Sequence, residues 1–539
     1  MTCLIATMVL APGVLPAATQ SQSMPVVPKW ERFEHEFTSL ADYANPLQDV
    51  TVTVLFVSPL GETTQVYGFW DGGRTWRVRF APDQPGHWRF KSTCSDAANL
   101  GLNEQTGEFL CTSTLSQSRF FLHGPVRVAA DRQHLEHEDG TPFFWLGDGV
   151  WSGARSSDPK SWQVYGIVRS SQNFTVAEWA ATGGEDDKGQ SAFTGFPEKI
   201  GINPQFFRGL DSKIATLSEV GLLSAIAPFD PAAPASAPMA LPDDQAALVM
   251  RYMVARWGGD PVAWILPVGK STNELHRWSR IGREVFAGTH HAPVLVWAKD
   301  EPEVLSSFRD QDWVDMLGFQ APLPSDNERL RSVLTGEALD TSSPNRLLPL
   351  IGFTPVENAP SGGSGRRPNA SDVRTSAYWS LLLGHAAGVS YGAFGVENWD
   401  TTVGPKSEDK LGAGLAFWHK ALFMPGAKQV GHMAGLLGEL KFWQLRPEPK
   451  MVANTAATAR AAGRIFAAST QAKDLALVYV SDERMLELAE DAMPQAPAIT
   501  WYNPRQGDTS PAVAVVAQRT CQFPTPAPGD WLLVIKAGK

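Results

Sequence analysis

The stretch from 142 to 151 reads PFFWLGDGVW, and it decides the fold. Four bulky apolar residues, Phe143 to Leu146, follow one another without alternation and end at Gly147 and Asp148. A continuous apolar run closed by a turn residue predicts a strand buried on both faces, as in a parallel sheet. In (β/α)8 barrels, the residues just past such strands form the catalytic rim. We therefore expect Asp148 either to contact substrate at this rim or to cap the helix that follows.

Apolar and helical segments alternate after this stretch. Further strands are predicted at 221–228, 262–266, 293–298, 316–320, 347–352 and 388–394. Helical periodicity predicts helices at 204–220 and 243–257, and a Pro/Ala-rich linker at 230–242 separates them. Such alternation is typical of a parallel α/β architecture, and its length favours closure into a (β/α)8 TIM barrel.

The segments on both sides of the barrel have a β pattern. Runs at 50–59, 64–82 and 86–96 alternate apolar and polar residues, and Asp71-Gly72-Gly73 is a hairpin-turn signal. This spacing predicts an N-terminal immunoglobulin-like β-sandwich. Short strands are also predicted in a small C-terminal β-sandwich, at 464–469, 474–480, 499–505 and 529–535. The predicted domains are a signal peptide at 1–23, a sandwich at 25–116, a barrel at 117–445 and a second sandwich at 446–539.

The composition excludes some classes of partner. A net charge of -10 without any Lys/Arg block argues against nucleic acid and against an anionic membrane surface. After the N-terminal segment no stretch is apolar enough for a membrane span, which needs about 18 residues. The 19 Trp beside 8 Tyr are compatible with stacking on sugar rings, although Trp also fills cores. No cofactor is expected, and the oligomeric state stays unknown.

The N-terminal segment predicts export. Residues 1–18 are apolar and lead into the polar TQSQS, as in a secretory signal, although a basic n-region is missing. Cys94 and Cys111 flank a Gly/Asn-rich loop and could form a disulfide in an exported protein. Two free buried thiols are the alternative, because spacing alone does not set the Cα distance.

Five motifs together resemble the apiosidase-like glycoside hydrolases. They are PFFWLGDGVW, WILPVGK (264–270), the helix RTSAYWSLLLGHAAGVSYG (374–392), ITWYNPRQGD (499–508) and PGDWLLVI (528–535). The resemblance covers nearly all of the chain after residue 23. It implies a secreted (β/α)8 enzyme with an N-terminal β-sandwich and a C-terminal domain labelled collagen-binding. The implied substrates are side chains of plant or algal polysaccharides.

Two positions depart from the pattern of that family. Its fourth strand typically ends in Gly-Gly-Asp, whose Asp serves as the acid, whereas here Lys270 follows Pro267, Val268 and Gly269. Its seventh strand typically leads into Glu-Pro-x-Tyr-Glu. Here Thr354 faces the first Glu, and Glu357 lies about one position from the second. The resemblance therefore implies altered positions for both catalytic carboxylates.

Other rim carboxylates could replace the missing pair. Glycosidases need two carboxyls, about 5 to 9.5 Å apart. We expect Glu357 to be the nucleophile or base, with Glu274 or Glu397 as the acid; the alternatives are a loop salt bridge, a helix cap and a loop-fixing contact. The candidate substrate-binding residues, each with a structural alternative, are Asp148, Trp151, Lys270, Trp297, Trp399 and Asp400.

No metal site is expected, because His290 and His291 lack a third ligand at a suitable spacing. The first hypothesis is therefore a glycoside hydrolase that acts on polysaccharide or oligosaccharide side chains with atypical carboxylates. The second is a non-catalytic relative that binds glycans through the same groove. A purely structural role has the least support in the sequence.

Overall fold

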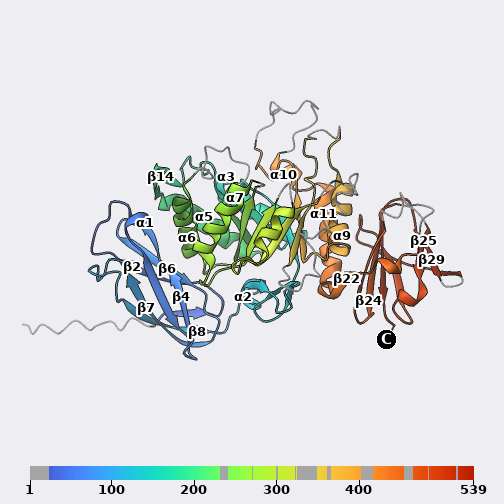
Figure 1. Cartoon of the computed structure of the whole chain (residues 1–539), viewed down its shortest axis with the longest axis horizontal. Helices are drawn as coiled ribbons and strands as arrows, with labels where there is room; N and C mark the ends of the chain where they lie inside the picture. The colour runs from blue at the N-terminus through green and yellow to red at the C-terminus, as the bar shows by residue number, and fades with distance from the viewer. Residues whose placement is uncertain are drawn as a thin grey trace, which may run out of the picture.

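Three β-rich parts follow one another along the longest axis of the molecule (Figure 1). The computed structural model describes residues 24–230, 241–269, 271–298, 302–321, 323, 349–360, 366–401, 417–453, 465–482, 485–517 and 520–538. An N-terminal sandwich, drawn in blue, precedes a central barrel, and a C-terminal sandwich, drawn in red, follows it. The predicted TIM barrel with two flanking β domains is therefore confirmed.

The central barrel is closed and parallel. Its strands, each hydrogen-bonded to the next, are β12 (Trp145–Gly149), β13 (Val176–Thr182), β16 (Leu223–Phe229), β17 (Val262–Val268), β18 (Val294–Ala298), β19 (Met316–Gln320), β20 (Leu350–Phe353) and β21 (Gly388–Gly392). Pairing of β12 with β21 closes the ring. β13 has no counterpart among the predicted strands. β12 extends through Gly147 and Asp148, so Asp148 lies within the strand and not beyond it.

Successive side chains of each strand point alternately into the barrel and toward the helices, as the period of a strand requires. Trp145, Val176 and Ile265 belong to the cluster inside the barrel. Leu146 and Ala177, their neighbours in sequence, pack in the cluster under the helices. A side chain near the top of an inward row therefore faces the catalytic rim, whereas its neighbour is covered by a helix.

Helices surround the barrel. They are α3 (Gly153–Ser156), α4 (Pro159–Ser171), α5 (Pro204–Glu219), α6 (Asp243–Trp257), α7 (Thr272–Phe286), the 3-10 helix η2 (Pro302–Phe308), α9 (Ala370–Leu382), α10 (Trp418–Ala421) and α11 (Pro425–Gly438). The helix expected over 374–392 ends at Leu382, and its last five residues form β21. A capping box between Asn369 and Asp372 fixes the start of α9.

The N-terminal sandwich consists of two sheets. One has the order β1-β8-β7-β3-β4 and the other β2-β6-β5. Asp71-Gly72-Gly73 lies at the predicted turn between antiparallel strands β5 and β6. Cys94 and Cys111 are free buried thiols in this domain, and burial raises the pKa of Cys111 to about 11. The elements are β1 (Val26–Pro28), β2 (Phe33–Thr38), α1 (Pro46–Asp49), β3 (Val52–Val57), β4 (Thr63–Tyr67), β5 (Phe69–Gly72), β6 (Thr75–Phe80), β7 (Gly86–Cys94) and β8 (Thr106–Thr112).

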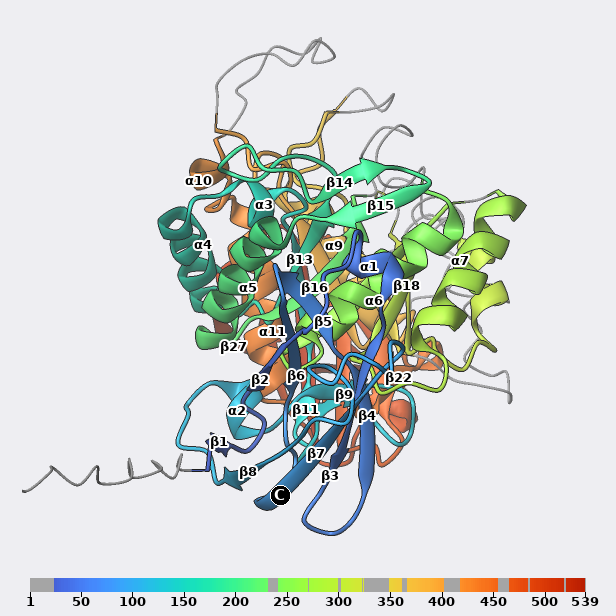
Figure 2. The same ribbon diagram turned by 90° about the vertical axis from the view of Figure 1, so that its left-hand side faces the viewer.

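Two small units join this sandwich to the barrel. The linker contains α2 (Arg119–Leu122) and a three-stranded sheet of β9 (Val126–Val128), β10 (Leu135–His137) and β11 (Pro142–Phe143). A hairpin of β14 (Phe193–Phe196) and β15 (Lys199–Ile202) follows β13. It lies at the same upper end of the molecule as α3 and α10 (Figure 2).

The C-terminal domain is also a two-sheet structure. Its sheets have the orders β22-β23-β24-β30-β26-β27 and β25-β29-β28. The elements are η4 (Phe442–Gln444), β22 (Leu445–Pro447), η5 (Pro449–Met451), β23 (Ile465–Thr470), β24 (Leu475–Val480), β25 (Met485–Ala489), η7 (Glu490–Ala492), β26 (Ala498–Tyr502), β27 (Thr509–Pro511), β28 (Val515–Ala517), β29 (Thr520–Pro524) and β30 (Trp531–Lys536). In the part of the chain that the structure describes, no helix has the length and apolar character of a membrane span.

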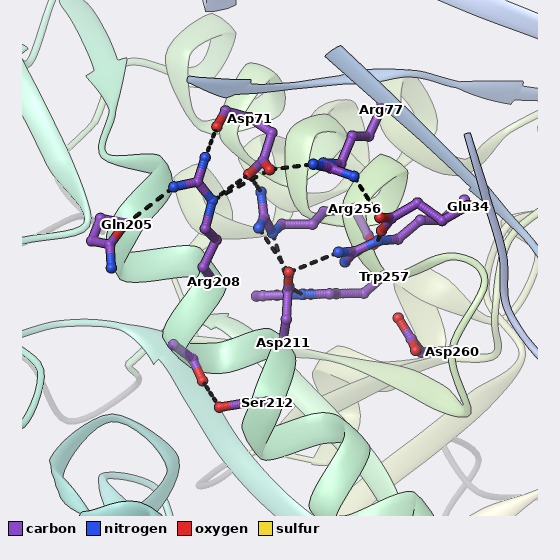
Figure 3. Close-up of polar contacts among 12 residues, drawn as sticks. Glu34, Asp71, Arg77, Gln205, Arg208, Asp211, Ser212, Arg256, Trp257 and Asp260 are labelled. Atoms are coloured by element: carbon purple, nitrogen blue, oxygen red, sulfur yellow. Dashed lines mark hydrogen bonds and ion pairs between the residues drawn. The ribbon is translucent and has the colours of Figure 1, made fainter. Parts of the chain in front are cut away.

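Buried ion pairs connect the N-terminal sandwich to α5 and α6 (Figure 3). Arg256 of α6 is fully buried and binds Asp71 of the sandwich at 2.9 Å. Asp211 of α5 lies 2.7 Å from Arg256 and 2.8 Å from Arg79 of β6. Burial alone would raise the pKa of Asp211, but the two guanidinium groups outweigh it and lower the pKa to about 2. The sandwich is thus attached to the barrel through paired charges.

Candidate active site

A pocket of about 190 Å³ opens at the carboxyl ends of the barrel strands. This is the end at which barrel enzymes place their chemistry. Glu178, Asp230 and Glu397 bring carboxyl groups to the lining, and the aromatic residues in it include Trp151 and Trp297. The described lining residues come from 149 to 398, so the barrel alone supplies them.

Glu178 lies in the floor of the pocket, on the inward face of β13. Trp145 Nε1 donates a hydrogen bond to its Oε1 at 3.0 Å, and Ser390 Oγ donates to its Oε2 at 2.5 Å. Burial raises the pKa of Glu178 to about 7. A Cβ atom on Gly147 would lie 2.2 Å from Oε1, so only glycine leaves room for this carboxyl. Burial thus favours the protonated carboxyl, which is the form that a general acid requires.

Glu397 lies above Glu178, in the loop after β21. Its Oε1 is 3.6 Å from the position that a Cβ of Gly149 would take. Gly147 and Gly149 are successive inward-facing positions of β12, about 6.6 Å apart along the strand. The carboxyl groups of Glu178 and Glu397 therefore lie beside successive inward-facing residues of β12. Of the three predicted catalytic residues, Glu397 is the one that lines the pocket.

Asp230 is the third carboxylate of the pocket. It follows β16 directly and lies 3.7 Å from Arg155 Nη2. Arg155 in turn donates to the backbone oxygen of Thr182 at 3.2 Å. In the sequence, Asp230 begins a Pro/Ala-rich segment that reads as a linker, so nothing there marks it as a rim residue.

The aromatic residues form a stack on one side of the pocket. Trp151 and Trp297 are nearly parallel, with ring centroids 5.6 Å apart. Phe353 also stacks on Trp297, with ring centroids 4.8 Å apart. Two of the three predicted tryptophans therefore line the pocket. Trp297 thus packs against two aromatic rings, Trp151 and Phe353.

Glu357 lies outside the lining of this pocket. Tyr391 Oη donates to its Oε2 at 2.7 Å, and the backbone nitrogen of Gly426 donates to the same oxygen at 3.0 Å. Gly426 is in the first turn of α11, whose N-cap residue Met424 has no capping side chain. Glu357 thus satisfies a free backbone donor of that helix. Burial raises its pKa.

Asp148 points away from the pocket, toward α4. It is fully buried and pairs with Arg169 Nε at 2.7 Å, while Tyr165 Oη donates to it at 2.9 Å. Its position is explained by strand alternation, since Gly147 and Gly149 take the inward places. The expectation that Asp148 ends the strand at the rim is corrected accordingly, and α4 is capped by Asp158 instead.

Three further predicted residues are described by the structure and are not among the lining residues of the pocket. Trp399 is 4% exposed and stacks on Trp418 at 4.2 Å, so it fills the core. Asp400 accepts from the backbone nitrogen of Trp418 through its own backbone oxygen. Glu274 lies in the first turn of α7 and folds against Gly269. Lys270 is outside the described residues.

The described residues contain no group of three or more His, Cys, Asp and Glu side chains that could hold a metal ion. The described lining of the pocket carries carboxyl, hydroxyl, amide and indole groups.

Three family models match the chain. One described as "Apiosidase-like, catalytic domain" matches residues 129–444. A domain of unknown function matches residues 26–95, and "Putative collagen-binding domain of a collagenase" matches residues 447–536. Among curated proteins, none matches the chain.

Solved structures of glycoside hydrolases share the fold. One described as a glycoside hydrolase has 18% identity and a TM-score of 0.66, covering 78% of this chain and 99% of its own. A family 5 glycoside hydrolase from Bacteroides vulgatus has 19% identity and a TM-score of 0.67, covering 79% and 95%. A "putative glycoside hydrolase" from the same organism has 14% identity and a TM-score of 0.70, covering 95% and 100%. At these identities the likeness shows the fold alone.

Proposed function

The chain belongs to the family of apiosidase-like catalytic domains, and from that premise we propose that it is a glycoside hydrolase acting on polysaccharide side chains. The observation that carries this proposal is the presence of two differently placed carboxyl groups in one rim pocket. Glu178 is buried with a pKa of about 7, and Glu397 lies above it toward the opening. Environments that separate two carboxyls in this way typically divide the roles of acid and base between them.

In this proposal Glu178 is the general acid. Trp145 Nε1 can only donate, so Oε1 of Glu178 remains an acceptor and the proton belongs on Oε2. Protonated Oε2 donates to Ser390 Oγ, whose own hydrogen can then turn toward the pocket that Ser390 lines. The proton thereby reaches the leaving oxygen of a substrate through one hydroxyl.

Glu397 is the second carboxyl of the proposal and attacks the sugar or activates a water. The two carboxyls face successive inward positions of β12, Gly147 and Gly149, and both line one pocket, as the carboxyl pair of a glycosidase must. Our proposal thus keeps Glu397 from the sequence-based set and replaces Glu357 and Glu274 with Glu178. Glu357 becomes a positioning residue that holds Tyr391 and the start of α11.

Glutamine variants test these assignments. Wild type, Glu178→Gln and Glu397→Gln are compared on pectic and algal oligosaccharides and on 4-nitrophenyl glycosides. Loss of a catalytic acid or base is expected to lower turnover about 10²- to 10⁴-fold. Glu357→Gln keeps an oxygen for Tyr391 and Gly426 and serves as the control. Turnover by Glu178→Gln equal to that of wild type would remove Glu178 from the mechanism.

A non-catalytic glycan-binding role is the second candidate. One observation in favour of this role is the threonine at position 354, after β20. Another is that none of residues 267–269, at the end of β17 and just after it, has a carboxyl side chain. This role predicts that oligosaccharides bind and are recovered intact, and that Glu178→Gln binds them as wild type does. Release of free sugar by the wild-type protein but not by Glu178→Gln would contradict the non-catalytic role.

Export is part of the proposal. The apolar segment at 1–18 lies outside the described residues and carries the features of a secretory signal. Expression of the full chain, followed by N-terminal sequencing of protein from the medium or periplasm, is expected to show cleavage near residue 23.

A further inference from the structure

A short turn connects the backbones of the two proposed catalytic residues. This bridging turn consists of residues 150–152, between β12 and α3. The backbone nitrogen of Val150 donates to the carbonyl oxygen of Glu178 at 2.8 Å. The backbone nitrogen of Ser152 donates to the carbonyl oxygen of Glu397 at 3.1 Å. The position of the bridging turn therefore sets how far apart the backbones of Glu178 and Glu397 lie.

The bridging turn has little local structure to hold it in place. It pairs once more with β13, where Trp151 O accepts from the backbone nitrogen of Ala180 at 2.9 Å. The helix that follows, α3, has only four residues, and its N-cap residue Ser152 makes no capping hydrogen bond with its side chain. Such a short helix is not stable by itself. The turn therefore needs contacts from outside its own segment.

Arg155 of α3 supplies such contacts. Its Nη1 donates to Thr182 O, at the end of β13, at 3.2 Å, and its Nη2 donates to Ser152 Oγ at 3.4 Å. Asp230, directly after β16, has its Oδ2 at 3.7 Å from the same Nη2. One guanidinium group thus connects the bridging turn to the ends of two neighbouring barrel strands.

The loop after β13 is shaped around this contact. Gly183 has a φ of +122°, and a Cβ on it would lie 2.5 Å from the Cβ of Asp230. A Cβ on Gly184 would lie 3.2 Å from Arg155 Nε. The carbonyl oxygen of Arg155 also accepts from the backbone nitrogen of Asp187 at 3.1 Å. Arg155 therefore holds this loop through its backbone and the strand ends through its side chain.

Stability alone does not explain this buried pair. Arg155 is 6% exposed and Asp230 is 7% exposed. Burial lowers the pKa of Arg155, and the charge of Asp230 opposes this effect. The desolvation of a buried ion pair typically offsets the attraction between its charges. The pair is better explained by the position that it fixes.

We propose that Arg155 is a positioning residue, which locks the bridging turn to the ends of β13 and β16 and so sets the relative placement of Glu178 and Glu397. This inference rests on the catalytic roles proposed for those two carboxyls. It gives Asp230 the role of a counter-charge to Arg155. Acid–base chemistry then stays with the other two carboxyls of the pocket.

Two substitutions remove the lock to different degrees. Arg155→Met keeps an unbranched apolar side chain but removes every N–H donor. Arg155→Lys keeps the charge beside Asp230 but lacks the planar fork that reaches Thr182 O and Ser152 Oγ together. On the best substrate we expect kcat to fall about 10- to 100-fold with methionine and about 3- to 10-fold with lysine, while KM changes less than about threefold. Asp211→Asn breaks a buried pair outside the pocket lining and should keep the kcat of wild type.

Hydrogen exchange followed by mass spectrometry measures the lock without any substrate. In both Arg155 variants, peptides from 150–157 and 176–182 should exchange faster, because the hydrogen bonds of the bridging turn open more often. Peptides from α6 should exchange as in wild type. Thermal unfolding checks that each variant is folded, and Arg155→Lys alone is sufficient if Arg155→Met does not fold.

The outcomes separate this inference from the proposed function. Wild-type kcat, or wild-type exchange at 150–157, in the folded Arg155 variants overturns the inference. Faster exchange over the whole chain also overturns it, because Arg155 would then have a general structural role. If Glu397→Gln lowers turnover but the Arg155 variants do not, the function stands and the inference fails. If the wild-type protein has no turnover, the hydrolase function fails, and exchange at the bridging turn decides the inference.

Discussion

Glu178 and Glu357 are both buried carboxyls of the barrel, but their hydrogen-bond partners give them different roles. Glu357 is not among the lining residues of the pocket, and its partners are the first turn of α11 and Tyr391 Oη, whose residue does line the pocket. One partner of Glu178 is the hydroxyl of Ser390, which lines the pocket. A proton on Glu178 can therefore reach the pocket, whereas Glu357 acts only through the residues that it holds.

The pH dependence of activity is the first prediction at this scale. In the proposed mechanism the acid form of Glu178 is the active one, and burial raises its pKa to about 7. We expect kcat/KM on the best substrate to fall above pH 7 along a single-proton limb. The measurement is a pH–rate profile from pH 4 to 9. A flat profile between pH 6 and 9 would exclude Glu178 as the acid.

The same group also gives stability a pH dependence. The pKa of Glu178 is raised above its unfolded value near 4.5, so the folded state binds the proton more tightly. Stability is therefore lost as pH rises from about 4.5 to 7, by about 3 kcal/mol. Glu178→Gln cannot ionise and should gain stability relative to wild type over this range. Urea unfolding at pH 5 and pH 8 measures the difference.

Gly147 provides a steric test of the same carboxyl. A Cβ at this position would lie 2.2 Å from Glu178 Oε1, so Gly147→Ala must displace the side chain. We expect a loss of about 1 to 3 kcal/mol of stability and a lower kcat. Gly209→Ala on α5 meets no atom within 4 Å and is the control. Equal kcat in both variants would show that the position of Glu178 is unimportant.

At the residue scale, the sequence predicts pocket residues at the ends of strands better than pocket residues inside strands. Glu397, Trp151 and Trp297 follow or end apolar runs, and they reach the pocket. Glu178 lies in the middle of β13, whose sequence VAEWAAT has no bulky run and one charge. The apolar run stops before Asp148 and therefore predicts this residue at the rim, but the strand continues through it.

At the element scale, buried apolar runs identify most of the barrel. β18 and β19 agree closely with the predicted strands because their bulky residues are contiguous. β13 is alanine-rich and contains one charged residue, and this pattern does not distinguish a strand from a helix. The 374–392 segment divides because α9 ends at Leu382 and β21 begins at Gly388.

Attachment of the N-terminal sandwich depends on charges carried by α5 and α6. Asp211→Asn keeps the shape but leaves Arg79 and the buried Arg256 without their shared partner. Breaking a buried pair typically costs about 3 to 5 kcal/mol, so we expect a loss of that size in chemical unfolding. Asp42→Asn removes an exposed pair with Arg74 and should leave stability unchanged. Similar stability in both variants would mean that the buried ion pairs add nothing to the free energy of unfolding.

In the whole molecule, the pocket and the surfaces on which the two flanking domains dock are formed by different residues. The sandwich docks on α5 and α6, the C-terminal domain docks on α9, and the described pocket lining comes from neither flanking domain. The order of domains was predictable because β-type and α/β-type patterns change abruptly along the chain. The ion pairs that dock the domains could not be predicted, because residues such as Arg256 and Asp71 are 185 residues apart in the sequence.

The C-terminal docking surface gives a prediction for the whole chain. Arg374 of α9 binds Asp530 at 2.7 Å, both side chains are nearly buried, and Tyr479 Oη donates to the same carboxylate at 2.9 Å. Asp530→Asn leaves Arg374 buried without its counter-charge, so the contact between barrel and C-terminal domain should weaken. We expect calorimetry to show a separate transition at lower temperature, and limited proteolysis to release the C-terminal domain. Sugar binding should not change, because the pocket contains no described residue of that domain. A fall in sugar affinity in this variant would show that the C-terminal domain supports the pocket and is more than an attached unit.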